Sequence, residues 1–167
     1  ARGRGLMLLT AHLGSFEVAA QAYAERFGAR WPMTALYRPA ENGFVRRLEE
    51  TARARPGLMT APASVAGVRQ LLRALKAGQT VGMLPDQVPP KGMGVWAPFF
   101  GRPAFTMTLA ARLARQLGAA LAVLWCERLP RGAGYVVHAQ PLARPPADDA
   151  DEVAAATAVN ASMEAVI

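Results

Sequence analysis

His12 and Glu17 are the residues whose types and spacing suggest acid–base chemistry. His12 follows an apolar run at 6–9, and Glu17 stands five positions further on, at the start of a segment with helical spacing. A continuous helix would turn the two side chains about 140° apart, whereas a break at Gly14 and Ser15 lets them converge. An ionised carboxylate beside an imidazole selects one tautomer and supports protonation of the ring. We therefore predict a two-residue general base that takes a proton from a hydroxyl group.

The same two residues have ordinary structural interpretations. A histidine at the end of a strand is commonly a packed or surface residue, and a glutamate in the first turn of a helix interacts favourably with the helix dipole. Ser15 is predicted to cap that helix, because serine accepts hydrogen bonds from free backbone N–H groups. Spacing alone favours the structural interpretation of the pair, so the rest of the chain must decide between the two.

The composition describes a basic chain with enough apolar residues for a hydrophobic core. Its 167 residues are 52% hydrophobic, which argues against a disordered chain and predicts a single domain over 1–167. Lys and Arg number 19 against 12 Asp and Glu, so the net charge is +7. We expect anionic partners, namely phosphate groups, an acidic protein, a nucleic acid or an anionic membrane surface.

The cysteine and histidine content narrows the chemistry. Cys126 is the only cysteine, so no internal disulfide can form, and its apolar neighbours predict burial. His12 and His138 are the only histidines, and the sequence has no cluster with the spacing of metal ligands. We therefore expect no metal and no cofactor. No apolar run reaches the ~18 residues that a membrane-spanning helix requires.

Apolar runs and helical repeats alternate along the chain. Strands are predicted at 6–9, 33–37, 58–60, 80–84, 119–126 and 135–138, and helices follow Ser15, Asn42, Ser64, Thr106 and Asp148. This alternation predicts an α/β fold with a mostly parallel sheet flanked by helices. Ligands in such folds bind beyond the carboxyl ends of the strands. His12 and Asp86 both follow predicted strands, so both are candidates for a site.

Two segments are expected to lie beside this sheet. The helix after Asn42 should bury an apolar stripe of Phe44, Val45 and Leu48, while most of its charged residues form a solvated face. Residues 88–105 form the longest irregular stretch and are rich in aromatic side chains. An apolar loop of this length commonly binds a ligand or covers a core.

The first motif resembles one found in a known family. His12-Leu13-Gly14-Ser15-Phe16-Glu17 is similar to the histidine, four residues, glutamate (HX4E) motif of the lipid A late acyltransferases. These are bacterial lauroyl and myristoyl transferases of the lysophospholipid acyltransferase superfamily. The similarity continues in order through Tyr37-Arg38-Pro39, Asn42, Arg53, Leu84-Pro85-Asp86-Gln87, Pro98-Phe99-Phe100-Gly101 and the Thr106 helix.

The resemblance implies a fold, an activity and a location. The fold would be that of the glycerolipid acyltransferases. The activity would be O-acyl transfer from acyl carrier protein to a hydroxyl of a Kdo-bearing lipid A precursor, in lipopolysaccharide biosynthesis at the cytoplasmic face of the bacterial inner membrane. Family members usually carry an N-terminal membrane helix and further chain at the C-terminus. Since this chain begins on a strand and stops within a helical pattern, we expect it to be an excerpt that lacks both.

The resemblance also implies roles for individual residues. His12 would be the general base and Glu17 its partner. Substrate-binding positions would be Arg38, Arg53, Asp86, Phe99 and Phe100, with the two phenylalanines in the wall of an acyl-chain pocket. Ordinary alternatives are solvated charges for the arginines, a turn for Asp86 and core packing for the phenylalanines.

The chemistry is consistent with this resemblance. A thioester is already activated, so a base for the acceptor hydroxyl and donors for the oxyanion suffice. Acyl carrier protein is acidic and lipid A precursors carry phosphates, which suits a basic surface. Two alternatives stay open. One is an acyltransferase for another lipid acceptor, such as a lysophospholipid or a glycolipid mannoside. The other is a non-catalytic module that binds anionic surfaces, although no nucleic-acid-binding signature is present.

Overall fold

Strands and helices alternate along the chain in the computed structural model, which describes residues 4–142, 146 and 151–167. The strands are β1 (Leu6–Leu9), β2 (Met33–Tyr37), β3 (Leu58–Pro62), β4 (Thr80–Met83), β5 (Gly94–Phe99), β6 (Arg102–Met107), β7 (Ala120–Arg128) and β8 (Tyr135–Pro141). The α-helices are α1 (Phe16–Phe27), α2 (Gly43–Arg53), α3 (Val65–Lys76), α4 (Leu109–Leu117) and α5 (Glu152–Glu164), and a short 3-10 helix covers Pro130–Gly132.

A mixed sheet with strand order β3-β2-β4-β1-β7-β8 forms the centre of the fold. All its pairs are parallel except β7 with β8, which form the antiparallel hairpin expected from the sequence. Helices flank the sheet, so the predicted α/β class is confirmed. The central strand β1 pairs with β4 and β7, which places its carboxyl end between theirs.

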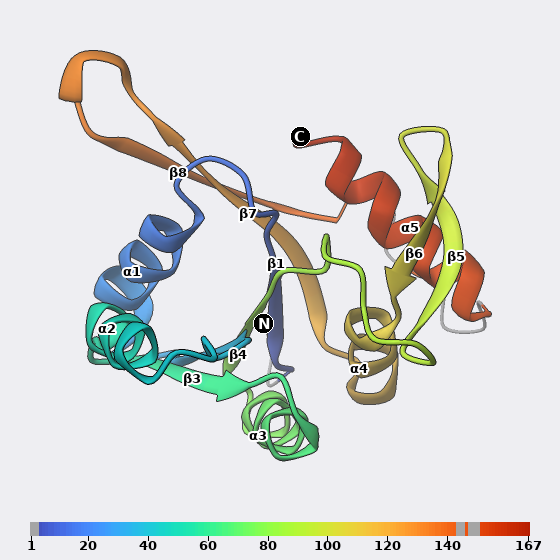
Figure 1. Cartoon of the computed structure of the whole chain (residues 1–167), viewed down its shortest axis with the longest axis horizontal. Coiled ribbons are helices and arrows are strands. Elements are labelled where there is room, and N and C mark those ends of the chain that lie inside the picture. The colour runs from blue at the N-terminus through green and yellow to red at the C-terminus, as the bar shows by residue number, and fades with distance from the viewer. Residues whose placement is uncertain (1–3, 143–145, 147–150) are drawn as a thin grey trace.

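The side chains of β1 alternate between the two faces of the sheet, as a buried strand requires. Met7 and Leu9 belong to a core cluster with residues of α3, α4 and α5, whereas Leu8 packs on the other face in a cluster with residues of α1. Figure 1 shows this division, with α1 and α2 on one side of the sheet and α4 and α5 on the other. Cys126 is buried in the α1 cluster, as predicted.

The prediction of an irregular stretch over 88–105 is wrong for most of its length. β5 and β6 form an antiparallel hairpin, and Thr106 lies inside β6, so the helix that it was expected to open starts only at Leu109. Proline normally argues against a strand. Here Pro98 and Pro103 lie opposite each other in a two-stranded sheet. Each strand of such a sheet has one edge without a partner strand, and the N–H groups that proline lacks are not needed at that edge.

This hairpin is attached to α5 through polar contacts. The Asn160 amide donates to the Pro98 carbonyl and to the Thr106 hydroxyl, each at 2.9 Å. The Phe100 N–H donates to the Glu164 carboxylate at 2.7 Å. Because these partners lie more than fifty positions apart in sequence, no local pattern could reveal the attachment of the hairpin to α5.

The helix α2 begins as predicted, but its apolar stripe is not buried. The Asn42 side chain accepts a hydrogen bond from the Phe44 N–H at 2.9 Å, which caps the helix. Phe44, Val45 and Leu48 are nevertheless 76%, 41% and 60% exposed. The periodicity identified an amphipathic helix correctly but assigned the wrong face to the protein interior.

Other helix ends agree with the sequence in part. Ser64 caps α3 through a hydrogen bond from the Gly67 N–H, and Gly118 ends α4 in the left-handed conformation. Ser15 occupies the N-cap position of α1 without a side-chain cap bond. The predicted start of the last helix, Asp148, lies outside the described residues, and α5 is capped by Asp151. No helix among the described residues has both the length and the hydropathy to span a bilayer.

Replacing Asn160 with Ala should loosen the hairpin on α5. The substitution leaves a carbonyl and a hydroxyl without their donor, which should lower the free energy of unfolding by about 1–3 kcal/mol. Urea denaturation would measure this change. Thr157→Ala is the matched control, since the Thr157 hydroxyl donates only to the Val153 carbonyl within the same helix. Equal losses in the two variants would contradict a specific role for Asn160.

Candidate active site

A tight turn follows β1 and places His12 at the carboxyl end of the sheet. Gly14 has a φ of +60°, a conformation that glycine adopts without strain. The Ser15 N–H donates to the Cys126 carbonyl on β7 at 3.1 Å. A Cβ atom at Gly14 would lie 2.6 Å from the same carbonyl oxygen, so only glycine fits. The turn is therefore fixed to a neighbouring strand, and α1 starts directly after it.

The carboxylate that contacts His12 belongs to Asp86. Its Oδ1 lies 2.8 Å from His12 Nδ1, and its Oδ2 accepts the His12 backbone N–H at 2.7 Å. Leu9 pairs with Met83 across β1 and β4, and His12 and Asp86 each follow three positions later. Parallel pairing thus brings the two side chains to the same edge of the sheet. The Asp86 side chain is only 18% exposed.

These contacts favour one tautomer of His12. A carboxylate accepts hydrogen bonds, so Nδ1 carries the proton and Nε2 retains its lone pair. Gln87 Nε2 lies 3.3 Å from His12 Nε2, where its amide can donate to that lone pair. The imidazole is therefore oriented from one side by Asp86, and its basic nitrogen faces a neutral side chain.

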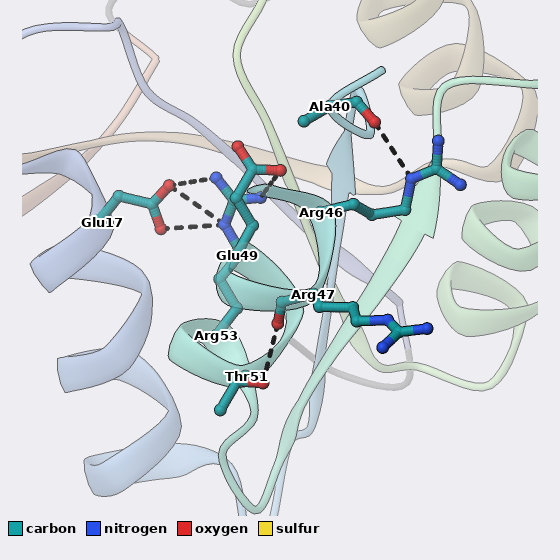
Figure 2. Close-up of polar contacts among 7 residues, drawn as sticks. All are labelled: Glu17, Ala40, Arg46, Arg47, Glu49, Thr51 and Arg53. Carbon is teal, nitrogen blue, oxygen red and sulfur yellow. Dashed lines mark hydrogen bonds and ion pairs between the residues drawn. The ribbon is translucent and has the colours of Figure 1, made fainter. Parts of the chain in front are cut away.

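Glu17 contacts Arg53 of α2 and makes no direct hydrogen bond with His12 among the described residues. Arg53 donates to Glu17 Oε1 through Nη2 at 2.5 Å and through Nε at 3.1 Å (Figure 2). The Glu49 carboxylate lies 3.8 Å from Arg53 Nη1. The hydrogen bond with Glu17 is the main cause of a raised pKa for the Arg53 guanidinium. The described residues thus show no direct His12–Glu17 hydrogen bond, and the Glu17–Arg53 ion pair connects α1 to α2.

A cavity of about 1000 Å³ opens beside these residues. Four of the predicted site residues line it, namely His12, Glu17, Arg38 and Arg53. Most of the remaining wall is apolar and comes from β2, α3, α4 and the segment after β4. Such a volume lies at the upper end of the ~300–1,000 Å³ range of small-molecule sites.

Three predicted substrate-binding residues do not line this cavity. Asp86 contacts the His12 imidazole and is not part of the cavity wall. Phe99 packs partly against the core under α5, and Phe100 is exposed in the turn of the β5–β6 hairpin with a φ of 48°. Phe99 and Phe100 therefore do not lie in the wall of this cavity, because the segment folds into a hairpin of which only Met107 lines it.

Sequence reasoning missed several polar residues of the cavity. Gln87 could have been found, since it directly follows Asp86 in the motif that carries the resemblance. Arg69 of α3 and Arg112 of α4 also line the cavity, but an arginine on an exposed helix face gives no local signal of this. No group of three His, Cys, Asp or Glu residues within the described part of the chain could hold a metal ion.

Gly14→Ala should destabilise the protein by more than the cost of placing alanine in a left-handed conformation, because the added Cβ also meets the Cys126 carbonyl oxygen. Gly118→Ala is the matched control, because Gly118 has the same φ of +60° and no atom within 4 Å of the added Cβ. The control should lose about 1–2 kcal/mol of unfolding free energy, the cost of a left-handed residue. Gly14→Ala should lose clearly more in urea denaturation. Equal losses would show that the contact with Cys126 does not constrain the turn.

Comparisons with known proteins agree with this geometry. The family model for the bacterial lipid A biosynthesis acyltransferases matches residues 1–167. A lipid A biosynthesis lauroyltransferase of Escherichia coli K12 is 31% identical to the chain over 157 residues. The match covers 93% of this chain and 49% of the relative, so the chain spans about half the length of that curated protein. By the family match over its whole length, the chain belongs to the bacterial lipid A biosynthesis acyltransferases.

Proposed function

We propose that this chain carries the acyl-transfer site of a lipid A biosynthesis enzyme. The enzyme moves a fatty acyl chain from acyl carrier protein to a hydroxyl of a Kdo-bearing lipid A precursor. The observation that carries the proposal is the His12–Asp86 pair beside a large apolar cavity with arginines in its wall. The family match supports acyl transfer in lipid A biosynthesis. The donor and the acceptor are our inference from the chemistry of the cavity and from the sequence motifs.

His12 acts as the general base in this proposal. Its Nε2 removes the proton of the acceptor hydroxyl while the oxygen attacks the thioester carbonyl carbon, whose π electrons move to the carbonyl oxygen. Collapse of the tetrahedral intermediate re-forms the carbonyl and expels the thiolate. The imidazolium then returns the proton to the leaving sulfur. Asp86 acts as a positioning residue that holds Nδ1–H and stabilises the positive charge formed on the ring.

Glu17 acts on the site through Arg53. The bidentate contact fixes the guanidinium, which lines the cavity with a side chain only 23% exposed. Arg38 stands at the end of β2 and lines the same cavity. Two guanidinium groups in one wall suit the phosphates of the acceptor or of the donor's prosthetic arm. We therefore assign Arg38 and Arg53 to substrate binding and Glu17 to positioning Arg53.

The apolar arm of the cavity holds the acyl chain. Val68 and Leu72 of α3 face Leu109 and Leu113 of α4 in its wall. Burial of a methylene group contributes about 0.8 kcal/mol, so a fatty chain gains substantial binding energy in such a channel. This assignment replaces the one that the sequence suggested for Phe99 and Phe100.

The proposed place of action is the cytoplasmic face of the bacterial inner membrane, where a lipid acceptor and an acidic carrier protein can both reach the site. The net charge of +7 supports both partners. An acyltransferase for another lipid acceptor fits the same cavity. Purified enzyme offered a Kdo-bearing lipid A precursor, a lysophospholipid and a glycolipid mannoside would decide, and mass spectrometry of lipid A with and without the gene would test the role in cells. Acylation only of a different lipid would refute the proposed acceptor.

Substitution of the His12–Asp86 pair should lower turnover without unfolding the protein. His12→Ala should reduce acyl transfer by ~10²–10⁴-fold, the usual contribution of general acid–base catalysis. Asp86→Asn should approach that loss, and the double variant should be little worse than His12→Ala, because residues that act as a unit are not additive. Initial rates of transfer from acyl carrier protein measure the effect, with thermal unfolding as the folding control. A folded Asp86→Asn enzyme with near-normal turnover would contradict the assignment.

The same assay separates the two possible roles of Glu17. If Glu17 acts through Arg53, the Glu17→Ala and Arg53→Ala losses should overlap, so that the double variant resembles Arg53→Ala alone. Their effect should appear mainly in the KM of the anionic substrate. If Glu17 instead serves His12, its loss should overlap with His12→Ala and appear in kcat. Independent, fully additive losses of Glu17 and Arg53 would remove the positioning role.

Arg69 and Arg38, at the cavity, should contribute to the capture of acyl carrier protein. Both side chains are exposed, so salt should screen their attraction for an acidic partner, with a Debye length of ~8 Å at 0.15 M and ~3 Å at 1 M. Arg69→Gln should raise the KM for acyl carrier protein at low salt and change it little at high salt. Arg128→Gln is the control, because Arg128 is exposed on β7 and does not line the cavity. A donor KM that is independent of salt would refute electrostatic capture.

A further inference from the structure

The helix α2 presents its apolar side outward and its polar side to the protein. Phe44, Val45 and Leu48 lie within about 100° of the helix circumference, and Arg53 lies about 180° from Phe44. Arg53 faces α1 through its ion pair with Glu17, as Figure 2 shows. The contact with the rest of the fold is therefore made by charged residues, and the apolar stripe is left without a protein partner.

This orientation is the reverse of that of an ordinary surface helix. Amphipathic helices normally bury their apolar stripe against the core and expose the charged side. α3 follows that rule, since Leu71 and Leu75 are buried and Arg69 and Arg73 are exposed. Three large apolar side chains within two turns of α2 stay exposed in the described structure. Such a face is typical of a surface that is covered when the protein functions.

The charges beside this face indicate what covers it. Arg47 is exposed, and its guanidinium group lies on the side of the helix away from Glu17 (Figure 2). Arg47 is about 60° from Phe44 around the helix, so it borders the apolar stripe directly. Helices that lie in a bilayer interface combine an apolar face with Lys or Arg at its edges, which attract anionic headgroups.

We propose that the apolar face of α2, formed by Phe44, Val45 and Leu48, inserts into the surface of an anionic lipid bilayer, with Arg47 against the headgroups. The bilayer would lie next to the cavity, because Arg38, just before α2 in the chain, lines that cavity. Exposed apolar residues of the cavity wall, namely Val65, Val88 and Met93, would extend the surface.

The role of this lipid surface in substrate entry rests on the proposed function. A lipid acceptor could then enter the cavity from the interface while its chains stay in the bilayer and its phosphates meet Arg38 and Arg53. The lipid surface itself is inferred from α2 alone and requires no acyl transfer.

Sedimentation with vesicles tests the lipid surface directly. The 167-residue chain should bind vesicles of phosphatidylcholine with phosphatidylglycerol and bind pure phosphatidylcholine weakly. Phe44→Ser with Leu48→Ser should weaken binding by about ten-fold or more, since burial of one such side chain is worth at least a factor of ten. Val136→Ser with Val137→Ser is the matched control, because these β8 residues are exposed but lie on another element. Circular dichroism melting confirms that the variants are folded.

A probe on the helix gives a second, independent measurement. Ala52 is exposed on the apolar side of α2, and the native Cys126 is buried, so an environment-sensitive dye reacts selectively at Ala52→Cys. Its emission should shift to the blue with anionic vesicles, whereas the same dye at Val137→Cys should not shift.

Three results would overturn the proposal. They are unchanged binding of the Phe44→Ser, Leu48→Ser variant, equal binding to neutral and anionic vesicles, and no dye shift at position 52. Failure of the proposed function is separate, since it is read from acyl transfer to acceptors in detergent micelles.

Discussion

The parallel pairing of β1 with β4 is the constraint on which the site depends. Leu9 lies opposite Met83, and equal numbers of residues then lead to His12 and Asp86. A slip of one residue between the strands would turn every side chain of one strand to the other face. The core clusters on both faces oppose such a slip, since Met7 and Leu9 belong to one and Leu8 to the other. Apolar packing of β1 on both faces of the sheet thus contributes to the position of the His12 imidazole.

Charge pairing explains why Glu17 does not contact the imidazole. A guanidinium binds a carboxylate through two N–H groups and always carries its charge, whereas an imidazole offers one donor and is charged only when protonated. Because α2 brings Arg53 near α1, Glu17 forms an ion pair with Arg53, and this interaction is stronger than a contact with His12 would be. Asp86 then provides the carboxylate that His12 requires, from the strand next to its own. The site therefore has two separate carboxylates, one beside the base and one beside a cation.

The fold was predictable where short-range patterns determine it. The positions of the strands in the central sheet, the caps at Asn42 and Ser64, and the glycine end of α4 follow from neighbouring residues alone. The site was predictable in its location and in four cavity residues, because strand ends converge on one edge of a parallel sheet. The partner of Glu17 was not predictable, because it depends on where α2 lies. Nor could periodicity show which side of α2 faces the protein, because an apolar stripe has the same spacing whether it packs on a core or faces outward.

The attachment of the β5–β6 hairpin to α5 has a consequence for the order in which the chain assembles during synthesis. The hairpin can close as soon as Met107 has left the ribosome, since its own pairs are local. Its anchors, Asn160 and Glu164, are made more than fifty residues later. Until α5 has been synthesised, the core beside α4 is open on one side, because it lacks the side chains of Val159 and Met163. This side of the nascent domain therefore stays open until α5 has been synthesised.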